Sequence, residues 1–159
     1  MRFADFNKLN EAKTKFLLIS PDDYFHNVYP NVCIAFSGNL ISPSLDAVNL
    51  GVTFDSQMTM NTYVNNIISK GYGQLSNFWR AARRLSVDNK LQLVSSFILP
   101  SIDYCNITLL ATSKHNMQKL QKLLNSAVRF IFNLSGKRYR RSITPYMKKL
   151  HILPVEYRV

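Results

Sequence analysis

The spacing of the apolar residues changes near residue 57, and this change limits the fold that the chain can adopt. Between residues 48 and 54 an apolar side chain stands at every second position, which is the period of a half-buried strand. From about residue 59 to 84 apolar side chains recur at intervals of three and four, which is the period of an amphipathic helix. We therefore predict an α+β fold, with a small antiparallel sheet in residues 1–56 and a helical bundle in residues 57–159.

Three segments of the first part are predicted to be strands. Residues 13–20 form a short apolar run after a polar start, and residues 32–42 alternate around a glycine turn, as a hairpin does. The third strand is residues 48–54, where Gly51 indicates a bulge or a close approach of another backbone. Asp55 follows this strand, and we expect it to accept backbone N–H groups at the start of the next helix.

The second part begins with two predicted helices. The first covers about residues 59–84, with a kink or break at Gly71 and Gly73, because glycine is costly inside a helix. The second follows a Ser86 cap and bends at Pro100. In this second helix, four side chains are expected to face inward: Leu91, Val94, Phe97 and Ile98.

Three further helix starts are predicted. One lies near Ser113 and opens a long apolar stripe. The next has Thr144 as its cap and Pro145 as its first helical residue, and the last is at Pro154. Because the chain ends soon after that start, the helical part is expected to be truncated at its C-terminus.

The charge of the chain is uneven. The net charge is +11, but residues 1–103 hold nine basic and eight acidic residues, whereas residues 104–159 hold eleven basic residues and one acid. An almost purely cationic segment points to a polyanionic partner, and nucleic acid is the default. An anionic membrane surface would also attract cations, but neither terminus carries an amphipathic anchor.

The basic residues of the second half gather in two places, which we predict to contact nucleic acid. Helical spacing puts Lys119, Lys122 and Arg129 near one flank of the third helix. A basic loop follows, in which cations can contact phosphates and an aromatic ring can stack on a base. Its residues are Lys137, Arg138, Tyr139, Arg140 and Arg141. The alternative is an ordinary solvated surface, but such a surface mixes charges of both signs.

The sequence offers no arrangement for metal or phosphate chemistry. The three histidines do not form a pair at zinc-ligand spacing, and no glycine-rich phosphate loop occurs. A polymerase holds two metal ions with carboxylates, but Asp5 stands alone here and Asp22-Asp23 reads as part of a solvated turn. We therefore expect no metal site.

The two cysteines, Cys33 and Cys105, are too far apart in the sequence and too few to suggest a disulfide framework. We expect two buried, reduced thiols in an intracellular protein. No apolar run approaches the length of about 18 residues that a membrane helix needs.

Taken in order, several segments resemble one family, the reverse transcriptase of jockey-type non-LTR (LINE) retrotransposons. The resemblance covers nearly the whole chain from about Leu9 and falls on the part downstream of the catalytic aspartates. The segments are NEAKTKFLLI, VNLGVTFDSQMTM, KLQLVSSFILPSIDYCN, KLQKLLNSAVRFIFNL and ITPYMKKLHILPVEYRV.

The resemblance implies roles for particular residues. Lys13 falls in the N-x-x-K-T segment at the edge of the palm, where the family's lysine assists the leaving pyrophosphate. Leu50, Gly51 and Val52 fall on the hairpin of the primer grip, which positions the primer end. The helices from about residue 59 fall on the thumb, which follows the template–primer backbone of RNA or DNA.

The chain also departs from the family. The aspartates that hold Mg²⁺ in the parent enzymes lie upstream of the matching segments, so we expect a fragment or relic without polymerase activity alone. Residual nucleic-acid binding is its expected function. The alternatives are an accessory part of a reverse transcriptase completed by another chain, or a translated pseudogene with no selected role. The missing palm strands would leave a sheet edge open to a protein partner.

Overall fold

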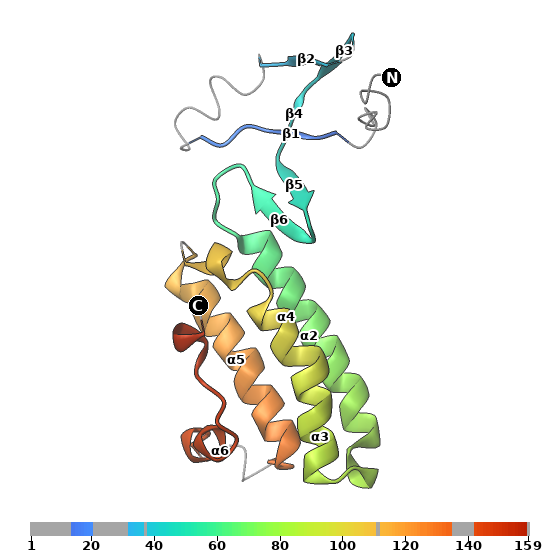
Figure 1. Cartoon of the computed structure of the whole chain (residues 1–159), viewed down its shortest axis with the longest axis vertical. Helices are drawn as coiled ribbons and strands as arrows, with labels where there is room; N and C mark the ends of the chain where they lie inside the picture. Colours follow the sequence, from blue (N-terminus) through green and yellow to red (C-terminus); the bar gives the residue numbers. More distant parts are fainter. Residues whose placement is uncertain (1–13, 21–31, 37, 111, 135–141, 159) are drawn as a thin grey trace, which may run out of the picture. The chain divides into compact units, whose positions relative to one another are not determined.

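The computed structural model describes residues 14–20, 32–36, 38–110, 112–134 and 142–158. The chain divides into two compact units, Met1–Met58 and Thr59–Val159, which we call the strand unit and the helical unit. In the described residues, strands form the regular structure of the first unit and helices that of the second (Figure 1). The fold is therefore α+β, as predicted.

The strands of the described residues pair in three two-stranded ladders, so the single antiparallel sheet expected from the sequence is wrong. The strands are two to four residues long. In the two antiparallel ladders a short turn joins the paired strands, whereas the parallel ladder pairs strands that are far apart in the sequence. The ladders are parallel β1 (Phe16–Leu17) with β4 (Pro43–Ser44), antiparallel β2 (Ile34–Phe36) with β3 (Asn39–Ile41), and antiparallel β5 (Asp46–Asn49) with β6 (Val52–Asp55).

The hairpin β5–β6 turns at Leu50 and Gly51, which the alternating pattern had placed inside a strand. Both residues have positive φ, 48° and 82°, and Asn49 lies opposite Val52, as in a two-residue type I′ turn. The turn interrupts the alternation, so the expected common apolar face does not form: Leu50 is 84% exposed and Val52 only 1%.

The first helix of the helical unit, α2 (Asn61–Ala81), runs through both of its glycines without a break, so the predicted kink is wrong. Gly71 is buried against α5. A Cβ atom at this position would lie 2.6 Å from Cδ2 of Leu123, a side chain with no exposed surface. Gly71 is thus explained by the close approach of the two helices, whereas a Cβ at Gly73 would meet nothing within 4 Å.

The same substitution at the two glycines is expected to change stability in opposite directions. Gly73→Ala should raise the free energy of unfolding by about 0.5–1 kcal/mol, because alanine favours the helix and adds no clash. Gly71→Ala should lower it by about 1–2 kcal/mol, because overpacking against Leu123 outweighs that gain. Urea unfolding of both variants measures the difference, and equal effects would contradict the close approach at Gly71.

After the 3₁₀ turn η4 (Ala82–Arg84), the chain enters a second helical stretch. Its predicted cap is confirmed, since the backbone N–H of Asn89 donates to Oγ of Ser86 at 3.2 Å. The stretch consists of α3 (Val87–Leu93), the π turn η5 (Val94–Ile98) and α4 (Leu99–Asp103).

The π turn lies directly before Pro100, where the sequence predicted a bend. Proline cannot donate a backbone hydrogen bond and its ring presses on the carbonyl four residues earlier, and a wider turn accommodates both effects. Val94 and Ile98 are fully buried. Phe97 also faces α2, where its ring lies against Phe78, but it keeps 48% of its surface exposed, so its predicted burial is only partial. A π turn rotates less per residue than an α-helix, which accounts for the partial exposure of Phe97.

The core of the helical unit forms around α5 (Lys114–Ile131), which packs against α2, α3 and η5 (Figure 1). Its predicted start is confirmed, because Oγ of Ser113 accepts from the backbone N–H of Asn116 at 3.3 Å. The apolar stripe that the spacing predicts runs from Met117 to Phe132, and six of its eight side chains have no exposed surface: Leu120, Leu123, Leu124, Ala127, Val128 and Ile131. Phe130, which the pattern missed, is equally buried.

Short elements complete the unit, namely η6 (Asn106–Leu109), α6 (Thr144–Lys149) and η8 (Val155–Tyr157). The helix α6 begins at Thr144, one position earlier than predicted, with Ile143 as its N-cap, and the predicted last helix is a 3₁₀ turn. The end of the chain is held by Arg158, whose Nε donates to Oδ1 of Asp103 at 2.8 Å and whose Nη2 pairs with Oδ2.

Both cysteines are free and exposed, so the expected buried thiols are wrong. Cys105 has a φ of 54° at the turn between α4 and η6, where the predicted helical stripe ends. Nearby, the Tyr63 hydroxyl donates to the carbonyl oxygen of Tyr104 at 2.8 Å. Burial, with a smaller effect of Cys105 and Tyr104, raises the pKa of Tyr63 above its ordinary value.

Within the described ranges, no helix combines the length and the apolar character needed to cross a membrane.

Candidate nucleic-acid interface

The charged face of α5 lies opposite its buried stripe. No acidic residue occurs between Lys114 and Ile131, so the helix presents cations without counter-charges of its own. Lys122 is exposed and Arg129 is half-buried in the last turn. The two are seven residues apart, which places them on one face and about 10.5 Å apart along the axis.

Lys119, the third predicted residue of this flank, has a different environment. It is half-buried, and its Nζ donates to Oδ1 of Asn65 on α2 at 3.1 Å. Part of its hydrogen-bonding capacity is therefore used to connect α5 with α2. Lys122 and Arg129 consequently form the main cationic face of α5.

Aromatic contacts bring the ends of three helices together. The ring of Trp79, near the end of α2, lies edge-on to that of Phe130 near the end of α5, with centroids 5.3 Å apart. Phe132, directly after α5, lies 4.9 Å from the Tyr146 ring of α6, and Nζ of Lys149 lies 5.9 Å from its centroid. The last turns of α2, α5 and α6 thus meet at one end of the helical unit.

This end carries further cations that were not among the predicted site residues. They are Arg80 in the last turn of α2, Arg83 and Arg84 in η4, and Lys148 and Lys149 in the last turn of α6, all exposed. The three arginines lie within residues 1–103, where the acidic residues of the strand unit offset their charge. The net charge of that half of the sequence therefore gave no sign of them.

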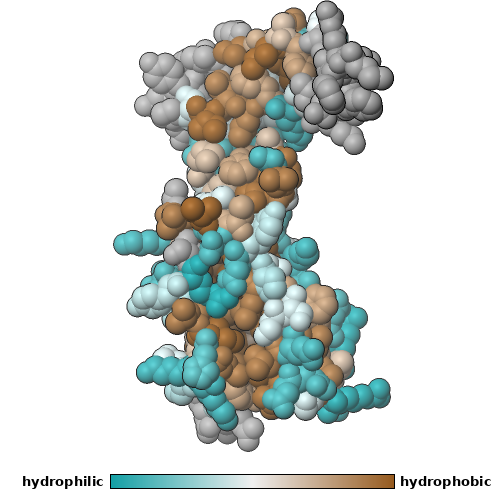
Figure 2. Space-filling model, viewed as in Figure 1, coloured by the Kyte–Doolittle hydropathy of each residue, from teal (hydrophilic) through white to brown (hydrophobic). Residues whose placement is uncertain are grey.

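Counted by unit, the separation of charge is sharper than the sequence halves suggested. Residues 59–159 hold sixteen basic and three acidic residues, a net of +13, and residues 1–58 hold four basic and six acidic residues, a net of −2. One of the three acids, Asp103, is paired with Arg158. In Figure 2, hydrophilic side chains project from the helical unit, with apolar surface between them.

The remaining predicted site residues lie elsewhere. Lys13 and the basic loop, Lys137, Arg138, Tyr139, Arg140 and Arg141, fall outside the described residues. Of the primer-grip-like residues, Leu50 and Gly51 are exposed at the hairpin tip, while Val52 is buried and has almost no surface for a ligand.

The described part of the strand unit places two carboxylates on one hairpin, β5–β6. Asp46 and Asp55 lie opposite each other in β5 and β6, and Asp46 forms an exposed ion pair with Lys15 at 3.8 Å. Among the described residues, no three His, Cys, Asp or Glu side chains come together to bind a metal ion. The N-cap residue of α2 is Met60, so Asp55 is not the cap of that helix, and the alternative role of Asp55 in an Asx-type turn stays a prediction.

No family model, no curated protein and no solved structure matches this chain. Its function is therefore argued from its own charge and geometry.

Proposed function

We propose that the chain binds nucleic acid through the phosphate backbone and that the helical unit carries this activity. The observation that carries the proposal is the net charge of +13 on that unit against −2 on the strand unit. Cations that neutralise phosphates release condensed counterions, which provides affinity without a need for sequence recognition.

The arrangement of the cations supports this proposal. Lys122 and Arg129 present two charges along one face of α5, and the arginines of residues 80–84 add a second group at the end where the three helices meet. A surface that served only solubility would mix the two signs. Two of the three acids in the unit are Asp88 and Glu156. They lie in the first turns of α3 and η8, where a negative charge interacts favourably with the helix dipole.

We further propose that the chain derives from the reverse transcriptase of a jockey-type retrotransposon, with the strand unit as a residual palm edge and the helical unit as a thumb. The ordered sequence segments support this origin, and the two-residue turn at Leu50-Gly51 agrees with the hairpin that the resemblance implies. For this chain we propose binding to a template–primer through its phosphate backbone.

Binding of the whole chain to an RNA–DNA hybrid is expected to weaken steeply as salt rises. A few phosphate contacts should give a log–log slope of affinity against salt of about −4 to −6. Filter binding between about 50 and 200 mM salt measures the slope. Failure to bind the hybrid at the lowest salt would contradict the proposal, and binding with a slope near zero would contradict the phosphate contacts.

A protein partner for the strand unit is a second proposal. Its observation is the exposed apolar surface of the described strands and their flanks, which Figure 2 shows as a largely apolar face. Contiguous apolar surface of this kind commonly marks an interaction site. The exposed side chains include Ile19, Ile34, Leu40, Leu45, Val48 and Leu50.

A further inference from the structure

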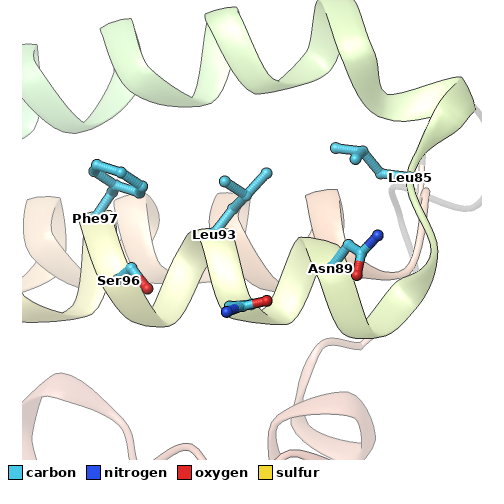
Figure 3. Close-up of a pocket in the computed structure, with 6 residues that line it drawn as sticks. Leu85, Asn89, Leu93, Ser96 and Phe97 are labelled. Atoms are coloured by element: carbon cyan, nitrogen blue, oxygen red, sulfur yellow. The ribbon is translucent and has the colours of Figure 1, made fainter.

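A groove beside α3 combines apolar and hydrogen-bonding side chains and is separate from the cationic face of α5. Its volume is about 280 Å³, and it is lined by Leu85, Asn89, Gln92, Leu93, Ser96 and Phe97. Figure 3 shows Leu85, Leu93 and Phe97 pointing to the same side, toward the neighbouring turns of α2, with Asn89 and Ser96 along the same helix. The groove therefore has an apolar wall and a polar edge.

The aromatic wall of the groove is supported by two further aromatic rings of the helical unit. Phe97 lies edge-on to Phe78 of α2, with ring centroids 5.9 Å apart, and Phe78 in turn lies 5.9 Å from the buried ring of Phe130. Phe97 belongs to the π turn and keeps 48% of its surface exposed. π turns often occur at functional sites, and here one presents a supported aromatic ring to solvent.

The chemistry of this groove fits a nucleobase. A base has a flat apolar face that stacks on an aromatic ring, and its edge carries hydrogen-bond donors and acceptors. Phe97 provides the stacking surface, and the amides of Asn89 and Gln92 provide both donors and acceptors. A volume near 280 Å³ lies just below the range of small-molecule sites, about 300–1,000 Å³, and suits one ring system.

The charge around the groove favours nucleic acid over a protein helix. Arg83 and Arg84 directly precede Leu85 in the chain, and both are exposed, so a phosphate can be bound next to the groove. An amphipathic helix needs a row of apolar contacts over two or more turns, but here amide and hydroxyl groups alternate with the apolar side chains.

We propose that this groove accepts an unpaired base of a nucleic acid whose backbone is bound by the arginines of residues 80–84. The proposal rests on the nucleic-acid binding proposed above and adds a preference for single-stranded segments. A base inside a duplex is stacked and paired, so it cannot enter the groove.

The test compares Phe97→Leu with the unchanged chain on a single-stranded DNA containing 2-aminopurine and on a blunt RNA–DNA hybrid. Removing one stacking ring should weaken single-strand binding about tenfold, because such a ring contributes about 1–3 kcal/mol per base. Binding of the hybrid should stay within about twofold. The 2-aminopurine fluorescence should change when the unchanged chain binds and should change less with Phe97→Leu.

Tyr157→Leu is the matched control, because Tyr157 is an aromatic residue with 68% exposure outside the groove, and this variant should bind both probes normally. Gln92→Glu is a second variant that alters the exposed edge of the groove without removing core contacts. It should weaken single-strand binding more than hybrid binding.

The outcomes separate the two proposals. If the unchanged chain binds the hybrid with the expected salt dependence but neither groove variant affects single-strand binding, the base-binding groove is overturned and nucleic-acid binding stands. That result would leave an apolar partner, such as an amphipathic helix, as the occupant of the groove. If the unchanged chain binds neither probe at low salt, both proposals are overturned.

Discussion

Lys90→Ala is expected to lower the free energy of unfolding of the helical unit by about 2–4 kcal/mol, because it empties a site in the core. Lys90 is only 1% exposed, an unusual state for a lysine. Its Nζ donates to Oδ1 of Asn133 at 2.7 Å and lies 5.7 Å from the centroid of the Phe130 ring. The hydrocarbon stem of the side chain therefore fills space between α3 and the end of α5.

The position of the ammonium group explains why it can be buried although no carboxylate of the described residues pairs with it. Asn133 directly follows the C-cap of α5, where the carbonyl ends of the helix give a partial negative charge. The aromatic face of Phe130 adds a cation–π contact, and the Asn133 amide oxygen accepts a hydrogen bond. These interactions offset part of the cost of removing the charge from water.

Lys90→Met separates the contribution of the stem from that of the charge. Methionine fills a similar volume, so we expect this variant to lie within about 1 kcal/mol of the unchanged chain. Urea unfolding followed by the fluorescence of Trp79 suits both variants, because Trp79 is the only tryptophan and packs on Phe130. If Lys90→Met is as destabilising as Lys90→Ala, the charge rather than the stem stabilises this site.

Local signals in the sequence predicted the helical unit well. The caps Ser86 and Ser113 each accept the backbone hydrogen bond expected of them, since an N-cap depends only on the residues next to it. The apolar stripe of α5 predicted eight inward side chains, and six of them are fully buried, because periodicity reports directly on the face that a helix buries.

Features that depend on tertiary packing were not predictable from the same patterns. From the sequence alone Gly71 is expected to break the helix, whereas the structure explains it by the close packing of Leu123 against this position. Lys90 reads as a surface residue, because its burial depends on a helix end more than 40 positions away. The partial exposure of Phe97 required knowledge of the π turn, which has no periodic signal of its own.

The strands were more difficult to predict than the helices, because residues that alternate along a chain need not belong to one strand. Positions 48–54 have the period of a strand, yet the turn at Leu50-Gly51 divides them into two. A bulky residue with positive φ is uncommon, so Leu50 gave no sign of a turn that Asn-Gly or Asp-Gly would have indicated.

The candidate interface was also only partly predicted from the sequence. Arg80, Arg83 and Arg84 join it through the contact between Trp79 and Phe130, which no local pattern indicates.

Reversing the charge of Lys122 and Arg129 together is expected to weaken binding of the RNA–DNA hybrid about 100-fold at 0.1 M salt. Each contact contributes about 0.9 to the salt slope, so losing one contact at this salt concentration costs close to tenfold in affinity. The two residues lie two helical turns apart, so their effects should be nearly additive. The slope of affinity against salt should fall in magnitude by about 2.

The single variants Lys122→Glu and Arg129→Glu and the control Lys15→Glu complete this test. Lys15→Glu changes the net charge by the same amount as either single variant, but it lies in the strand unit, where Lys15 forms an exposed ion pair with Asp46. We expect it to leave the slope unchanged, because the phosphate contacts belong to specific side chains and not to the overall charge. If Lys15→Glu weakens binding as much as Lys122→Glu, only net charge matters and α5 is not the interface. If the double variant keeps its full slope, the phosphates are bound by cations other than Lys122 and Arg129.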